Sequence, residues 1–141
     1  MELLFAKYFA GYNLAYGQAD MSRLEIDPIT KKHKPTYRWN DEEATADIYK
    51  QHLTGEKSIG IQPCNESGLA RFGVIDVDFK DYKNYDRKKF VEIIQKNNLP
   101  LIPVLSKSGG IHLYLFLDTF ISAVIIRSFL SNLLPLFKLK H

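Results

Sequence analysis

The chain reads FGVIDVDF at residues 72–79, and this run is apolar except for the two carboxylates of Asp76 and Asp78. Alternate side chains of a strand share a face, so both aspartates are predicted to point one way and the apolar residues the other. Two like charges at the end of a core strand repel each other and lose hydration, and a divalent cation relieves both costs. Carboxylate oxygens suit Mg²⁺ or Mn²⁺. The alternative is a pair of hydrated aspartates at an exposed strand end.

A second polar cluster stands in the sequence SKSGGIHLYLF at residues 106–116. Small residues let the backbone approach a bulky anion, and backbone N–H groups with two hydroxyls can surround phosphate oxygens. His112 begins a strand, from which its ring could donate to a phosphate oxygen. The residues predicted to bind a nucleotide are Ser106, Lys107, Ser108, Gly109, Gly110 and His112. The alternative is an ordinary hairpin turn followed by a half-buried histidine.

Periodicity and turn residues place the other elements around these two clusters. A short helix is predicted over 2–10, an irregular loop with a short hairpin over 11–38, and a helix from Asn40 to Leu53. The remaining predicted elements are strands 58–62, 71–79, 101–105 and 111–117, and helices 84–97 and 121–139. The order from residue 58 is β, β, α, β, β, α, which predicts an α+β fold with a mixed or antiparallel sheet and helices on one face.

Length and composition describe an ordinary globular protein. The chain has 141 residues, of which 45% are hydrophobic and 25% charged, with a formal charge of +3. The lone Cys64 excludes an internal disulfide and fits a reducing compartment. Arg127 and Pro135 interrupt the apolar stretch 121–139 and argue against a membrane span. We therefore expect a soluble, cytoplasmic protein that does not enter a membrane.

Two basic stretches are candidates for contact with nucleic acid. The first mixes positive charge with an aromatic ring, which suits single-stranded nucleic acid; its residues are Lys31, Lys32, Lys34, Arg38 and Trp39. Its alternative is a hydrated loop with Trp39 packed under the following helix. The second stretch is read as a hydrated helix face that could also guide a template strand; its residues are Lys80, Lys83, Arg87, Lys88 and Lys89.

The two polar clusters resemble motifs of the archaeo-eukaryotic primase superfamily. Its first motif is an apolar strand ending in Asp-x-Asp, matched at residues 74–78, and its second is a Ser- and Gly-rich turn closing with His and an apolar strand, matched at 106–116. Upstream, HLTG at 52–55 and SIGIQP at 58–63 resemble the primase domain of TOTE-type conflict systems. The resemblance covers residues 50–117.

The resemblance implies a primase catalytic core built on an RRM-like sheet. By it, Asp76 and Asp78 would hold Mg²⁺ or Mn²⁺ and, with His112, form the catalytic set, while Ser106, Ser108 and His112 would contact the triphosphate of a nucleotide. The implied reaction is attack of a 3′-hydroxyl on the α-phosphate, with two metals stabilising the attacking and leaving oxygens. The implied partners are nucleoside triphosphates, a DNA or RNA template, and a fused or separate C-terminal half or helicase.

The family places a third motif on a strand after the helix that follows the second motif, and Asp118 does not match it. We therefore expect one truncated domain over residues 1–141, with an N-terminal part at 1–56, an RRM-like core at 57–120 and a C-terminal helix at 121–141. Two alternatives remain open. One is a catalytically incomplete remnant that binds nucleotide or nucleic acid. The other is a haloacid-dehalogenase-like phosphotransferase, although that class usually has Thr or Val where Lys80 stands and needs a doubly wound sheet.

Overall fold

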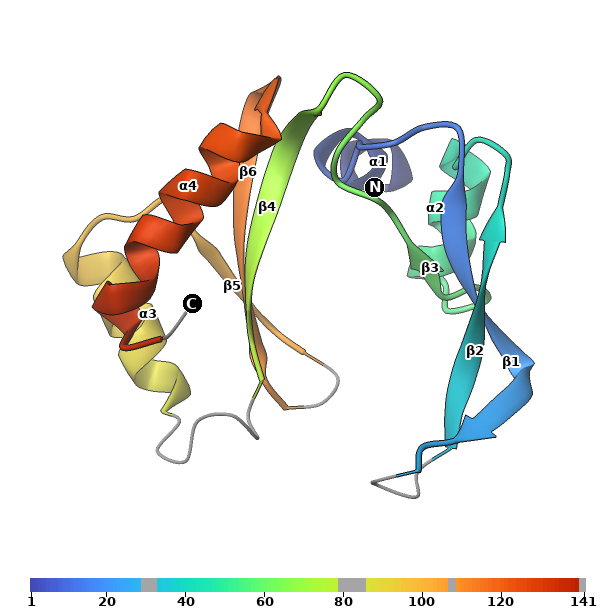
Figure 1. Ribbon diagram of the computed structural model, residues 1–141, viewed down its shortest axis with the longest axis horizontal. Coiled ribbons are helices and arrows are strands. Elements are labelled where there is room, and N and C mark those ends of the chain that lie inside the picture. Colours follow the sequence, from blue (N-terminus) through green and yellow to red (C-terminus); the bar gives the residue numbers. More distant parts are fainter. Residues whose placement is uncertain (29–32, 79–85, 107–108, 140–141) are drawn as a thin grey trace. The chain divides into compact units, whose positions relative to one another are not determined.

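The computed structural model describes residues 1–28, 33–78, 86–106 and 109–139. The chain forms two compact units, Met1–Ser67 and Gly68–His141 (Figure 1). The internal division was predicted after residue 56, whereas the units divide after Ser67. The predicted α+β class is confirmed, because helices accompany two sheets whose strand pairs are all antiparallel in the described part of the chain.

The N-terminal unit contains a three-stranded sheet and two helices. Its elements are α1 (Glu2–Tyr8), β1 (Tyr16–Ile26), β2 (His33–Asn40), α2 (Ala46–Leu53) and β3 (Ile59–Gly60), and the strand order is β2-β1-β3. The short hairpin predicted within the irregular stretch 11–38 is present but much longer than expected, since β1 and β2 form most of that stretch. Gly17 and Pro35 suggested breaks, but Gly17 lies opposite Trp39, whose ring fills the space beside it. Pro35 is on the edge strand β2, where proline is tolerated.

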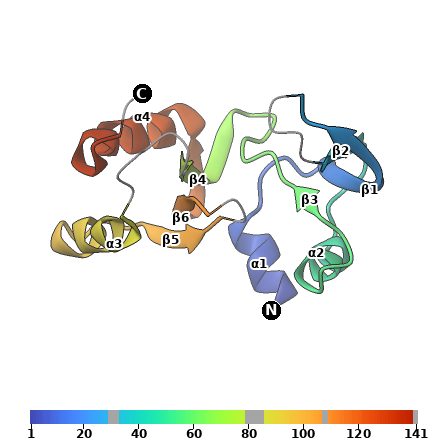
Figure 2. The ribbon, with the colours of Figure 1, turned by 90° about the horizontal axis from the view of Figure 1, so that it is seen from below.

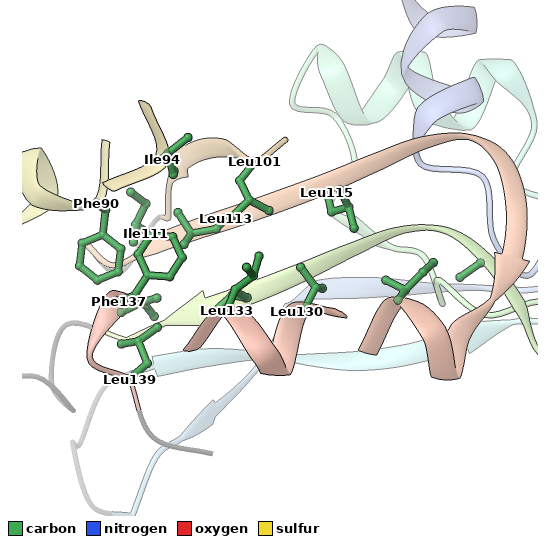
Figure 3. Packing of buried hydrophobic residues seen from close by; sticks show 14 residues of the cluster. Phe90, Ile94, Leu101, Ile111, Leu113, Leu115, Leu130, Leu133, Phe137 and Leu139 are labelled. Carbon is green, nitrogen blue, oxygen red and sulfur yellow. The ribbon is translucent and has the colours of Figure 1, made fainter. Parts of the chain in front are cut away.

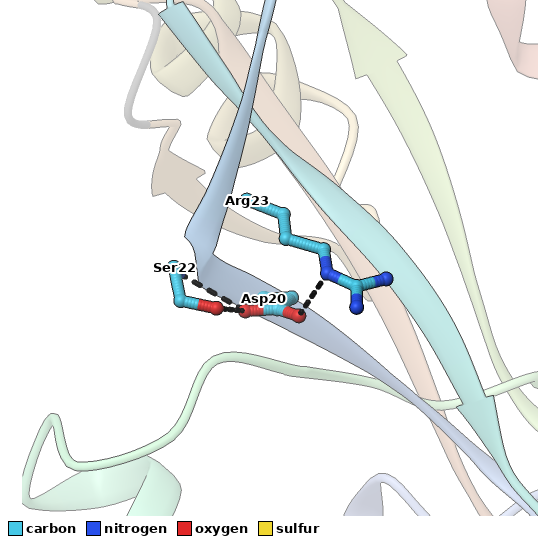
Figure 4. A network of polar contacts seen from close by, with 3 residues as sticks. All are labelled: Asp20, Ser22 and Arg23. Atoms are coloured by element: carbon cyan, nitrogen blue, oxygen red, sulfur yellow. Dashed lines mark hydrogen bonds and ion pairs between the residues drawn. The ribbon is translucent and has the colours of Figure 1, made fainter.

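The register of the hairpin shifts between Asp20 and Leu24 of β1. Figure 4 shows the local contacts: the Asp20 carboxylate accepts from the backbone N–H and the hydroxyl of Ser22 and lies 4.0 Å from Nε of Arg23. Hydrogen bonds from Ser22 lower the pKa of Asp20 below its ordinary value. The hydrogen bonds from Ser22 therefore stabilise the charged form of Asp20 where the register of β1 shifts.

The helix predicted to begin at Asn40 begins instead at Ala46. Thr45 is its N-cap, since its hydroxyl accepts from the backbone N–H of Ile48 at 3.5 Å. Glu42, which we expected in the first turn, accepts a hydrogen bond from the Tyr16 hydroxyl at 2.9 Å. Glu42 therefore bonds to a residue 26 positions away, instead of lying in the first turn of the helix where local sequence had placed it.

Helices α1 and α2 of the N-terminal unit lie side by side (Figure 2), and aromatic rings join them. The Phe5 ring lies 6.0 Å from both the Tyr49 and the His52 rings. Nδ1 of His52 lies 3.1 Å from the Lys57 carbonyl and 3.5 Å from the backbone N–H of Ile59. His52, in the upstream HLTG sequence, thus holds the turn between α2 and β3.

The C-terminal unit has the predicted order of elements. They are β4 (Leu69–Val77), α3 (Arg87–Lys96), β5 (Ile102–Leu105), β6 (Ile111–Ser122), α4 (Ala123–Leu133) and the 3-10 helix η2 (Leu134–Phe137), and the strand order is β4-β6-β5. The last helix is shorter than predicted, because β6 continues to Ser122 and α4 ends at Leu133. Both sheets are antiparallel, so the doubly wound haloacid-dehalogenase alternative is wrong.

Helices α3 and α4 cover one face of the C-terminal sheet, as predicted (Figures 1 and 3). Val77 and Leu113 are fully buried between sheet and helices. At Gly73 an added Cβ would lie 2.6 Å from Ile126 and 2.8 Å from Leu130, so α4 lies directly on the strand. The buried cluster consists of Ala70, Ile75, Val77, Phe90, Ile94, Leu101, Ile111, Leu113, Leu115, Ile126, Leu130, Leu133, Phe137 and Leu139.

The most apolar stretch of the sequence is divided between strand, helix and core. Ile126, Leu130 and Leu133 of α4 are buried, whereas Val124 and Ile125 are exposed on the same helix. Among the described residues, no helix is both long and apolar enough to cross a membrane.

Candidate active site

Asp76 and His112 face each other across two paired strands. The antiparallel register of β4 and β6 sets Asp76 directly opposite His112, and Nε2 of His112 lies 3.3 Å from Oδ1 of Asp76. The Asp76 side chain is 67% exposed and that of His112 is 31% exposed. Strand pairing therefore brings together two predicted site residues that are 36 positions apart in the sequence.

The alternation predicted for β4 is present around Asp76. Ile75 and Val77 are buried in the core, and Asp76 between them is exposed. Asp78 follows the last residue of the strand and is half-buried. Val77 pairs with Ile111, so Asp78 and Gly110 come directly after and before this pair. The second carboxylate is therefore at the end of β4 where the glycine turn enters β6.

Tyr114 lies on the same face of β6 and supports the imidazole. Its hydroxyl is 3.4 Å from Nδ1 of His112, and its ring stacks on Phe116 with centroids 5.6 Å apart. Burial, and secondarily the charge of Asp76, raise the pKa of the Tyr114 hydroxyl, which keeps its proton. Because the Asp76 carboxylate can only accept, a neutral His112 has its proton on Nε2, and Nδ1 accepts from Tyr114.

The turn between β5 and β6 is tight and partly bonded to itself. The N–H of Ser106 donates to the Gly110 carbonyl and the N–H of Gly109 donates to the Ser106 carbonyl, both at 3.0 Å. Gly109 has φ +91°, and an added Cβ at Gly110 would lie 2.3 Å from the Val77 carbonyl oxygen. Both positions therefore need glycine. The Gly109 N–H, expected to face a phosphate, is engaged within the turn.

Two predicted residues of this turn, Lys107 and Ser108, lie outside the described residues. Ser106 is half-buried just after β5, and Gly110 is buried against the end of β4. The described part of the turn therefore adjoins the strand that carries Asp76.

Arg87 is a neighbour of the turn that the sequence had placed on a hydrated helix face. As the first residue of α3, it donates from Nη2 to the Gly109 carbonyl at 2.8 Å. Local sequence gave no signal for this contact, because it joins residues 22 positions apart. Strand alternation does place Tyr114 on the same face as His112, because it is two residues further along the predicted strand.

The carboxylates suit a metal that is completed by other ligands. In the described part of the chain, no three or more His, Cys, Asp or Glu side chains gather closely enough to hold a metal ion. Mg²⁺ is commonly held by one or two carboxylates, with waters and substrate phosphates as its other ligands. The exposed Asp76 and the half-buried Asp78 fit that kind of site.

The basic stretch of the N-terminal unit is more ordered than expected. Lys34 forms an ion pair with Asp27, and Arg38 is exposed on β2. Trp39 is 55% exposed, and its ring is next to Gly17 of β1 rather than under the following helix. Lys31 and Lys32 lie outside the described residues.

A family model named TOTE conflict system, Archaeo-Eukaryotic Primase domain matches residues 5–140. The chain belongs to this family. The match includes nearly the whole sequence, beyond the 50–117 region on which the resemblance rested. At family level the chain is a primase-type nucleotidyltransferase domain. No curated protein matches the sequence.

Proposed function

We propose that this domain transfers nucleotides to the 3′-end of a nucleic acid strand paired with a template. The 3′-oxygen forms a bond to the α-phosphorus of a nucleoside triphosphate, the bond to the diphosphate breaks, and the hydroxyl proton passes to solvent. The observation that carries this proposal is the pairing of Asp76 with His112 beside the glycine turn. This pair places a carboxylate that could bind a cation, Asp76, beside an imidazole that could donate a hydrogen bond to a phosphate, His112.

Each residue has a role that follows from its chemistry. Asp76 and Asp78 would hold Mg²⁺ or Mn²⁺, which supplies positive charge for the phosphate and for the attacking and leaving oxygens. Nε2–H of His112 faces Asp76 in the structure, and once a cation occupies that carboxylate the same N–H would donate to a phosphate oxygen. Tyr114 fixes the His112 ring from the other side, so the donor direction is set before the nucleotide binds.

We also propose that the N-terminal sheet contributes to template binding. Trp39 and Tyr37 are alternate residues of β2 and therefore share a face, and both are mostly exposed. Exposed aromatic rings can stack on unpaired bases of DNA or RNA. Arg38 lies between them in the sequence and therefore takes the opposite face of β2.

Primer extension on a primed single-stranded DNA template, with Mg²⁺ or Mn²⁺ and either ribo- or deoxynucleoside triphosphates, tests the transfer reaction. We expect extension by the unaltered chain and a loss of at least about a hundredfold in Asp76→Ala, because a cation ligand is removed. Glu92→Gln is the matched control, since it removes an exposed carboxylate from α3.

Thermal unfolding of Asp76→Ala should match that of the unaltered chain, since the side chain is mostly exposed. Full extension activity in this variant would refute the assignment of Asp76. Metal-dependent binding of a nucleoside triphosphate without any extension would favour the alternative of a catalytically incomplete remnant.

A further inference from the structure

Arg87 reaches the glycine turn from a separate helix. The Asp86 carboxylate accepts from the backbone N–H of Lys88 at 3.0 Å and caps α3, so Arg87 is the first helical residue. From this position its Nη2 donates to the Gly109 carbonyl at 2.8 Å. Gly109 lies three residues before His112, so a guanidinium group is fixed at the turn that leads into the candidate site.

The remaining donors of Arg87 are suited to an anion. A guanidinium group has five N–H donors in a rigid planar fork that matches two oxygens of a phosphate. Among the described residues, Gly109 is its one hydrogen-bond acceptor, and the side chain is exposed. The bond to Gly109 already restricts the side chain, which reduces the entropy lost when a ligand binds.

We infer that Arg87 binds the polyphosphate of the nucleotide. The inference rests on the proposed function, because it takes the glycine turn as the nucleotide site. The competing role is a structural clamp that holds the Gly109 carbonyl and does not touch the ligand. The two roles differ in one respect: a phosphate contact matters more for a triphosphate than for a monophosphate, whereas a clamp affects both nucleotides equally.

Isothermal titration of the whole chain with ATP and with AMP in MgCl₂ separates the two roles. In Arg87→Ala we expect the affinity for ATP to fall about tenfold or more, as for a lost hydrogen bond to a charged group, and the affinity for AMP to change much less. Lys96→Ala is the matched control, because it removes the same charge from an exposed position at the other end of α3. That variant should bind both nucleotides like the unaltered chain.

Arg87→Lys provides a second variant that keeps the charge and loses the fork. Its affinity for ATP should lie between those of Arg87→Ala and the unaltered chain, at an unchanged melting temperature, and this variant decides the question if Arg87→Ala does not fold. Equal losses for ATP and AMP, or equal losses in the Arg87 and Lys96 variants, would overturn the inference.

The Asp76→Ala variant shows which idea has failed. If Asp76→Ala loses Mg²⁺-dependent ATP binding while Arg87→Ala keeps it, the role of Arg87 is refuted and the proposed function stands. If the unaltered chain binds neither nucleotide, both are refuted.

Discussion

The two sheets of this domain have similar strand pairing but different support. The C-terminal sheet packs against α3 and α4 through a continuous buried cluster. In the described part of the N-terminal unit, the buried apolar residues are Ala15, Tyr16, Ala19 and Tyr49. A functional site needs fixed side-chain positions, and the better-packed sheet holds the candidate residues Asp76 and His112. The comparison indicates that the C-terminal core determines the geometry of the site, whereas the N-terminal sheet exposes aromatic side chains.

Removing a core side chain from the C-terminal sheet should have the largest effect. Leu113 is 0% exposed, so Leu113→Ala should lower the free energy of unfolding by about 2–5 kcal/mol. Tyr37 on β2 is 76% exposed, and Tyr37→Ala should change it by less than about 0.5 kcal/mol. Urea unfolding followed by circular dichroism measures both values. Equal losses would contradict the contrast between the sheets.

Adding a methyl group to a glycine sharpens the same comparison. Gly73→Ala places a Cβ within 2.6 Å of Ile126 and should reduce stability by about 1–3 kcal/mol, because α4 must shift. Gly60→Ala on β3 meets no atom within 4 Å and should be close to neutral. Melting temperatures of the two variants test this, and a destabilised Gly60→Ala would show that β3 is more closely packed than the structure indicates.

The two sheets also use arginine differently. Arg71 on β4 is buried and donates to the carbonyls of Leu117 and Asp118, so Arg71→Met should cost about 1–2 kcal/mol by leaving them unpaired. Arg23 on β1 is highly exposed beside Asp20, and Arg23→Met should have almost no effect. Urea midpoints give the difference, and similar values for both variants would refute it.

The smallest expected effect is on the stability at alkaline pH, and it arises from Tyr49 in the N-terminal unit. Burial raises the pKa of Tyr49 above its ordinary 10.0, so the folded chain keeps this proton longer than the unfolded chain does. The resulting stability is complete below about pH 10 and is lost as the pH rises further. In Tyr49→Phe this loss is absent, so stability should fall less steeply above pH 10. Urea midpoints between pH 9 and 11 measure the slope, and an unchanged slope would contradict the burial of Tyr49.

The sequence predicted the C-terminal unit better than the N-terminal one. Its elements occur in the predicted order, because each has a clear apolar period, and Phe90 and Ile94 face the core as the period of α3 requires. The length of the β1–β2 hairpin was underestimated because Gly17 and Pro35 read locally as breaks. The extension of β6 to Ser122 was missed because it depends on pairing with β4, where Ser122 lies opposite Leu69.

Part of the candidate site was also within reach of the sequence. The candidate residues Asp76, Asp78 and His112 were named from local patterns and from the family resemblance. Their contacts were not, since strand alternation put Tyr114 on the face of His112 but did not predict their hydrogen bond, and Arg87 was read as a hydrated helix face that could guide a template strand. The hydrogen bond from the Gly109 N–H to the Ser106 carbonyl was also missed, because it depends on the backbone conformation of the turn, which local sequence patterns did not predict.

By itself the sequence determined which strand carries Asp76, which face of that strand Asp76 takes and where glycine precedes His112. These features follow from the two-residue period of a strand and from local backbone freedom. Only the tertiary structure decided that Asp76 lies opposite His112, that Arg87 holds the Gly109 carbonyl and that Glu42 serves Tyr16 rather than a helix. Each of these contacts joins residues more than twenty positions apart, and strand register and helix packing, rather than local propensity, select them.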